Sequence, residues 1–185
     1  MKVSLKWLSK YIDISDLSVN ELAEVVTRSG VEIEEIEELS NGSNLVIGQV
    51  LECEDHPESD HLHVCKVDVG DEVLQIVCGA PNCRKGLKVI VAKVGAKLDA
   101  IKVTITKGVI RGIESCGMMC SLLELGVNEK YLSDYQKAGI EELPSDAPVG
   151  HNDPLDYLGL RDTIFYLKLL PLLMQMNIKI IHRLY

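Results

Sequence analysis

Between His56 and Ser121, apolar segments of five to eight residues alternate with turn-forming residues, and this pattern restricts the fold more than any other feature of the chain. The segments are rich in valine and isoleucine, and glycine, proline, asparagine or aspartate separates them. Segments of this length and composition are typical of β-strands. We therefore predict a mainly β fold, a small barrel or sandwich, with strands over residues 45–53, 62–69, 73–78, 87–92, 102–107 and 109–111.

Three positions add detail to the predicted barrel. Gly48 lies in the middle of the first long strand, where a glycine suggests the bend or bulge that a closed barrel needs. The segment 102–107 alternates strictly, so Val103 and Ile105 are predicted to face the core.

After the predicted strands, the sequence pattern changes to that of a short helix and an acidic segment. Ser121, with Glu124 three residues later, predicts a capped short helix over residues 122–126. Residues 128–148 are acidic and contain two prolines, so we predict a surface excursion that returns to the barrel.

The first 40 residues follow a different pattern, which predicts a small α/β module. Ser18 followed by Glu21 forms a capping box, which predicts a helix up to about Ser29. The next residues alternate between apolar and acidic side chains and predict a strand from Val31. A shorter amphipathic helix is predicted before this one. The side chains that the two helices are predicted to bury are Leu5, Leu8, Tyr11, Ile12, Leu22, Val25 and Val26.

The charges are distributed unevenly along the chain. The net charge is −9, which by itself argues against a nucleic-acid partner. Residues 66–112, however, carry nine basic and four acidic side chains, so this segment is positive within an acidic chain. Such asymmetry predicts a surface that binds a polyanion, and the alternative is an ordinary solvated β surface. The residues predicted to contact such a polyanion are Asn82, Arg84, Lys85, Lys88, Lys93, Lys102, Lys107, Arg111 and Ser121.

No aromatic side chain lies between residues 62 and 130 that could stack on a base. For a nucleic-acid partner, this favours recognition of shape and backbone, with modest affinity. No catalytic constellation is predicted either. His56, His61 and His63 stand beside acidic residues, which is typical of a polar turn.

The six cysteines allow two interpretations. The spacings Cys78-x4-Cys83 and Cys116-x3-Cys120, near three histidines, are compatible with a zinc site. Thiols within apolar strands, as at Cys53, Cys65 and Cys78, also behave as small hydrophobic side chains, and we favour this interpretation and predict no metal. Since no secretory signal is recognised, no disulfide framework is predicted.

The order of the motifs resembles that of a known family. The sequences VCKVDVG, LQIVCGAPN and RGIESCGMMCS resemble the tRNA-binding OB-fold domain of the EMAP-II type. Further matches are the opening MKVSLKWL, SGVEIE from Ser29, LPSDAPVG from Leu143 and DYLGLRD from Asp156. Together these resemble the N-terminal part of bacterial phenylalanyl-tRNA synthetase β subunits over about residues 1–165.

The resemblance implies an OB-fold barrel that binds tRNA, together with the small α/β module. It implies membership in a cytoplasmic (αβ)2 ligase that attaches phenylalanine to its tRNA with ATP and magnesium. The catalytic residues would lie outside this chain, so the chain alone is predicted to be inactive and to hold no cofactor. The alternatives are a protein-interaction module for subunit assembly that binds little RNA, and a metal-stabilised domain.

The resemblance also predicts where the parts of the chain begin and end. The predicted parts are the α/β module over 1–40, the OB domain over 41–152 and the start of a next module over 153–165. Residues 166–185 depart from the family pattern and are predicted to be an atypical apolar tail, frameshifted or artificially added. Pro171 and interspersed polar residues argue against a transmembrane helix in this tail, and no membrane partner is predicted.

Overall fold

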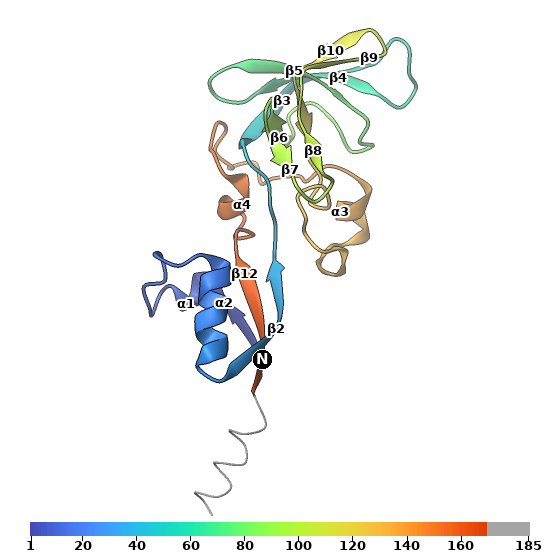
Figure 1. Ribbon diagram of the computed structural model, residues 1–185. Coiled ribbons are helices and arrows are strands. Elements are labelled where there is room, and N and C mark those ends of the chain that lie inside the picture. The colour runs from blue at the N-terminus through green and yellow to red at the C-terminus, as the bar shows by residue number, and fades with distance from the viewer. Residues whose placement is uncertain (170–185) are drawn as a thin grey trace, which may run out of the picture. The chain divides into compact units, whose positions relative to one another are not determined.

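A computed structural model describes residues 1–169 of the chain and divides into two compact units (Figure 1). The first unit comprises Met1–Leu39 together with the chain from Asp162 onward, and the second comprises Ser40–Arg161. Among the described residues, no helix has the length and apolar character needed to cross a membrane.

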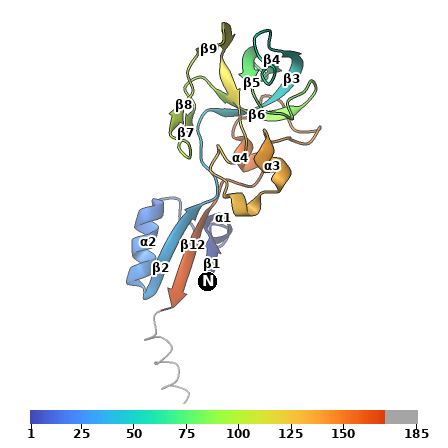
Figure 2. The ribbon, with the colours of Figure 1, turned by 90° about the vertical axis from the view of Figure 1, so that its right-hand side faces the viewer.

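The first unit is a three-stranded antiparallel sheet with one long helix beside it (Figure 2). The strand order is β1-β12-β2, so the strand that comes last in the described chain lies in the centre. Its elements are β1 (Lys2–Ser4), α1 (Leu5–Leu8), α2 (Val19–Arg28), β2 (Val31–Glu38) and β12 (Thr163–Leu169). Because β12 runs across residue 165, the predicted limit between 153–165 and 166–185 does not coincide with the end of an element. The rest of the predicted tail lies outside the described residues.

The capping box of α2 forms as predicted. The Ser18 hydroxyl accepts from the Glu21 amide, and the Glu21 carboxylate accepts from the Ser18 amide. The buried face of the helix is narrower than predicted, because Leu22 is buried whereas Val25 is 51% exposed. The predicted amphipathic helix before it is wrong in length, since α1 has four residues and none of them is buried.

The second unit is a five-stranded antiparallel barrel, which confirms the predicted mainly β, OB-type fold. The strand order is β11-β6-β3-β4-β5, and the Cys116 amide donates to the Gln75 carbonyl at 2.8 Å, so the β10–β11 run connects β5 back to β6. The barrel strands are β3 (Leu45–Asp55), β4 (His63–Asp68), β5 (Val73–Cys78), β6 (Lys88–Lys93) and β11 (Gly117–Met119), and β10 (Ile113–Ser115), directly before β11, pairs with β9. The other elements are β7 (Lys97–Leu98), β8 (Val103–Thr104), β9 (Gly108–Ile110), a 3-10 helix (Glu129–Tyr131), α3 (Asp134–Ala138) and α4 (Pro154–Tyr157).

The barrel core is aliphatic, as the alternation of the strands requires. Val67, Ile76 and Val89 have no exposed surface and pack in one cluster, while Ile47 and Ile90 pack in a second. The bulge of β3 lies between Val50 and Glu52, beyond the glycine where it was predicted.

Two predicted features of the later chain are wrong. The predicted strand 102–107 reduces to the short β8, and Val103 is 42% exposed while Ile105 is buried. The alternation fails because the chain enters through a turn in which Lys102 has a positive φ of 55°. Ser121 and Glu124 exchange the bonds of a capping box, yet residues 122–126 form a turn and no helix.

Candidate nucleic-acid interface

The outer face of β4 and β5 carries a connected polar network. The Lys66 ammonium donates to Gln75 Oε1 at 2.8 Å, and Gln75 Nε2 donates to the Glu114 carbonyl at 2.8 Å. The Glu114 carboxylate pairs with Lys107 at 2.9 Å, which lowers the pKa of Glu114 and raises that of Lys107. Strand alternation places Lys66 and Gln75 outside, because their neighbours point into the core.

Two loops meet beside this face. His56, in the turn after β3, is buried, and its Nδ1 accepts from the Glu58 amide at 3.0 Å. Its Nε2 then carries the hydrogen and donates to the Ile110 carbonyl at 3.3 Å, in the β9–β10 hairpin. The Arg111 guanidinium, at the hairpin tip, donates to the Glu58 carbonyl at 2.7 Å. The turn of residues 56–61 is therefore attached to the hairpin by two bonds.

This arrangement matches the part of OB barrels that binds oligonucleotides, namely the second and third strands and the loops after the first and fourth. Here β4 and β5 are the second and third barrel strands, and the loops are 56–62 and 94–112. We call this surface the β4–β5 face and define it by Lys66, Gln75, Lys107, Arg111 and Glu114.

A second group of predicted residues lies in the loop between β5 and β6 and at the first residue of β6. The Arg84 guanidinium forms two bonds with the Glu142 carboxylate, at 2.8 and 2.6 Å. The amide of Asn82 bonds the backbone of Ile140 through both its oxygen and its nitrogen. We call Asn82, Arg84, Lys85 and Lys88 the 82–88 cluster. Within it, Lys88 donates to the Ala147 carbonyl at 2.5 Å, while Lys85 is exposed.

Glu142 is the acid most affected by its surroundings. The bonds from Arg84, and further bonds from Tyr135 and Asn82, lower the pKa of Glu142 to about 2. Its neighbour Glu141 shows the opposite shift, because burial raises the pKa of that carboxyl.

These shifts predict an acid-dependent loss of stability. A carboxyl whose pKa is lower in the folded chain stabilises the fold above its unfolded pKa of about 4.5 and loses that contribution as the pH falls towards 2. The shift of Glu142 corresponds to about 3 kcal/mol at most, which exposure of Arg84 reduces to about 1 kcal/mol. We expect E142Q to be less stable than the unaltered chain at pH 7 and equally stable near pH 2, measured by urea unfolding.

The control for this prediction is the adjacent E141Q variant. Because the pKa of Glu141 is raised in the fold, its ionised form is unfavourable, and E141Q is expected to be no less stable at pH 7. A stability difference between E142Q and the unaltered chain that persists unchanged at low pH would contradict the assignment.

The remaining predicted residues bond to different neighbours and do not form one network. Lys93 pairs with Asp71 at 3.2 Å and with Glu72 at 2.8 Å, so its charge is compensated by the β4–β5 turn. Lys102 is exposed in the turn before β8, and Ser121 bonds to Glu124. The nine predicted residues therefore belong to several local networks, and three of their seven cations, Arg84, Lys93 and Lys107, are paired with carboxylates.

The sequence-based prediction did not select Lys66 and Gln75. Both lie opposite each other on β4 and β5 and point outward. The signal was present, because Lys66 alternates with Cys65 and Val67, which are fully buried. Applying the same rule of alternation to the neighbouring strand β5 would have identified Gln75 opposite Lys66.

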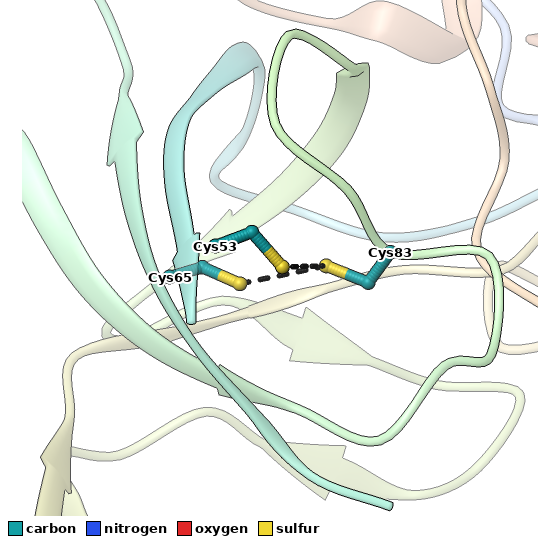
Figure 3. Close-up of side chains that lie close together, drawn as sticks. All are labelled: Cys53, Cys65 and Cys83. Atoms are coloured by element: carbon teal, nitrogen blue, oxygen red, sulfur yellow. Dashed lines mark hydrogen bonds between the residues drawn. The ribbon is translucent and has the colours of Figure 1, made fainter. Parts of the chain in front are cut away.

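The cysteines that come together overlap in part with those that the spacing suggested, because Cys83 belongs to both sets. All six are free thiols. Among the described residues, Cys53, Cys65 and Cys83 bring their sulfur atoms within 4.8 Å of one another (Figure 3). The bond with Cys65, together with burial, raises the pKa of Cys83, so this thiol is protonated at neutral pH and is a poor nucleophile.

Comparisons with known proteins identify the family to which the barrel belongs. Residues 45–152 match the family described as a putative tRNA binding domain. The phenylalanine–tRNA ligase β subunit of Geobacillus kaustophilus is 50% identical over 173 residues, covering 92% of this chain and 21% of that protein. The β subunits of Bacillus cereus and Streptococcus pneumoniae are 49% identical over 173 residues and 48% identical over 172, with the same coverage. The chain thus spans about a fifth of the length of these relatives.

Proposed function

The chain belongs to the family of putative tRNA binding domains, and we propose that it binds tRNA as part of the β subunit of a phenylalanine–tRNA ligase. The observation that carries this proposal is the coincidence of the family match, residues 45–152, with the barrel of the second unit. The chain is also identical to ligase β subunits at about one residue in two over 173 residues, and this extends the proposal to both units.

The β4–β5 face is the surface that we propose for the RNA. Among the described residues, Lys66 and Arg111 form no salt bridge there, since Lys66 donates to the Gln75 side chain and Arg111 to the Glu58 carbonyl. Their charges are therefore available for phosphates, although the nearby Asp60 offsets part of that of Arg111. Lys107 shares its charge with Glu114 and contributes less. Phosphate contacts of this kind position a nucleic acid and carry no sequence information by themselves. In this proposal, the β4–β5 face therefore recognises the backbone and shape of the tRNA.

The complete ligase supplies the chemistry in this proposal. It attaches phenylalanine to tRNA, works in the cytoplasm with an α subunit in an (αβ)2 assembly, and uses ATP and magnesium. Magnesium takes oxygen ligands, whereas the group of metal-ligating side chains found among the described residues consists of three thiols. These residues do not fit magnesium, so we place ATP and magnesium elsewhere in the ligase and expect no aminoacylation by this chain alone.

Salt-dependent tRNA binding tests the proposal. Two cations that neutralise phosphates, Lys66 and Arg111, give a slope of log affinity against log salt of about −1.8, so the affinity falls about 12-fold between about 50 and 200 mM salt. R111Q removes one contact and is expected to reduce this fall to about 3.5-fold. The measurement is a titration of labelled tRNA followed by fluorescence anisotropy at several salt concentrations.

K85Q is the matched control, since Lys85 is an exposed cation of the 82–88 cluster. It should leave the salt slope unchanged. If K85Q reduces the slope and R111Q does not, the RNA contact belongs to the 82–88 cluster and the placement is wrong. If the unaltered chain shows no salt-dependent binding of tRNA, the proposed function of this chain is contradicted.

Exposed apolar side chains beside the same face favour a second candidate function. Val73, Val109 and Ile110 are 55%, 70% and 40% exposed. Apolar groups of this kind suit a protein partner better than a phosphate backbone. In this second candidate function, the barrel serves subunit assembly. We then expect the tRNA titration above to show weak binding, while the chain still binds the α subunit of the ligase.

A further inference from the structure

Three cysteines from separate parts of the second unit converge inside the barrel (Figure 3). Cys53 on β3 and Cys65 on β4 are direct cross-strand partners, so their side chains lie on the same face of the sheet. Cys83 reaches them from the loop after β5. Its sulfur lies 3.4 Å from the sulfur of Cys65 and 3.8 Å from that of Cys53.

The position of Cys83 is determined by bonds other than its sulfur contacts. Its amide donates to the Ala80 carbonyl at 3.1 Å. The preceding Asn82 is bonded to Ile140 through both atoms of its side-chain amide. The loop therefore holds the third thiol against the other two in advance of any ligand, which is the preorganisation that a binding site requires.

The sulfur separations agree with those of a metal–thiolate site. Zinc binds thiolate sulfur at about 2.3 Å in a tetrahedral arrangement, which separates the sulfur atoms by about 3.8 Å. The two closest separations here are 3.8 and 3.4 Å, and all three sulfurs lie within 4.8 Å of one another. Small movements of the side chains would thus place all three at bonding distance from one ion.

The surroundings also suit such an ion. Cys65 and Cys83 are buried, whereas Cys53 is partly exposed and leaves a path for entry. Cys78 is on the same inner face, because it pairs with His63, two residues before Cys65 on β4. Its sulfur lies outside the group of three that are all within 4.8 Å of one another. Thiolate ligands select soft ions such as zinc over magnesium or calcium.

We propose that Cys53, Cys65 and Cys83 form a binding site for a thiophilic metal ion, with zinc as its occupant. The site joins β3, β4 and the loop after β5, so the ion would connect this loop to the two strands. A bound ion of this kind stabilises the folded chain over the unfolded one.

Cobalt titration tests the site directly. The chain is reduced, freed of metal with a chelator, and titrated with Co²⁺, which gives a near-ultraviolet thiolate-to-cobalt band when cysteines coordinate it. We expect saturation at one equivalent, loss of the band when Zn²⁺ is added, and a higher melting temperature with Zn²⁺ than without. C83S is expected to weaken cobalt binding by more than about tenfold.

C116S is the matched control, because Cys116 is partly buried in the same barrel but lies outside the group. It should bind cobalt like the unaltered chain. The C83V variant separates loss of the metal ligand from a folding defect, since valine replaces the thiol by an apolar side chain of similar size. It should fold, as circular dichroism reports, and gain no stability from Zn²⁺.

Two results would overturn the proposal. One is the absence of a cobalt band in the unaltered chain when thiol titration finds its cysteines reduced. The other is an equal increase in melting temperature with Zn²⁺ for C83V and the unaltered chain. Either result would leave the three cysteines as small apolar core residues.

Discussion

Replacing Phe165 by alanine is expected to unfold the first unit while the barrel stays folded. Phe165 lies on the central strand β12 and is 2% exposed. Removal of a buried phenylalanine costs about 3–5 kcal/mol. Among residues 1–39 and 162–168, Leu22 is the other apolar side chain that is buried. A unit with so small a core has little stability to lose, so we expect β1, β2 and β12 to separate.

Hydrogen exchange measured by mass spectrometry distinguishes the two units. In F165A, peptides from Met1–Leu39 should lose their protection, and peptides from Ser40–Arg161 should keep theirs. Y11A is the matched control, because it removes another aromatic ring from the same unit at a position that is 69% exposed. Its effect should stay within about 0.5 kcal/mol. Loss of protection throughout the chain in F165A would show that the units do not unfold separately.

Valine in place of Gly48 is expected to unfold the barrel. A Cβ atom at this position would lie 2.7 Å from Cγ2 of Val91 and 2.9 Å from Cγ1 of Val67. Both valines are fully buried, and β-branched side chains have little rotational freedom with which to move away. Overpacking of a core costs about 1–3 kcal/mol for small additions, so we expect at least about 3 kcal/mol for valine and less for alanine.

Gly108 provides the matched control for this substitution. It also lies in a strand, β9, and no atom lies within 4 Å of the Cβ that a substitution would add. G108V should therefore keep the melting temperature of the unaltered chain, whereas G48V should lower it sharply or prevent folding. Equal melting temperatures for the two variants would contradict the close packing described around Gly48.

Much of the barrel could be predicted because its determinants are local. The alternation of Lys66 with Cys65 and Val67 fixes which side of β4 is buried, whatever the partner strand is. The capping box of Ser18 and Glu21 similarly involves residues three apart, so it begins α2 without help from the rest of the chain. The resemblance in motif order identified the family, and the match over residues 45–152 confirms it.

The candidate site was predicted less well, because the distribution of charge along the sequence does not show which group each cation bonds in the folded chain. Arg84 finds Glu142 across 58 positions, and Lys93 finds Asp71 across 22. Both cations belonged to the same basic segment, yet each is paired with a carboxylate from another loop. The structure therefore leaves Lys66 and Arg111, on the β4–β5 face, as the cations that we propose for RNA.

By itself, the sequence determined the mainly β fold, the family and the presence of a basic segment, because these depend on local periodicity and motif order. The tertiary structure alone decided that β12 completes the first unit as its central strand. It also decided that Cys53, Cys65 and Cys83 meet, although spacing had pointed to other pairs. The physical reason is that strand pairing and loop closure join residues far apart in the chain, and this depends on the packing of the whole unit.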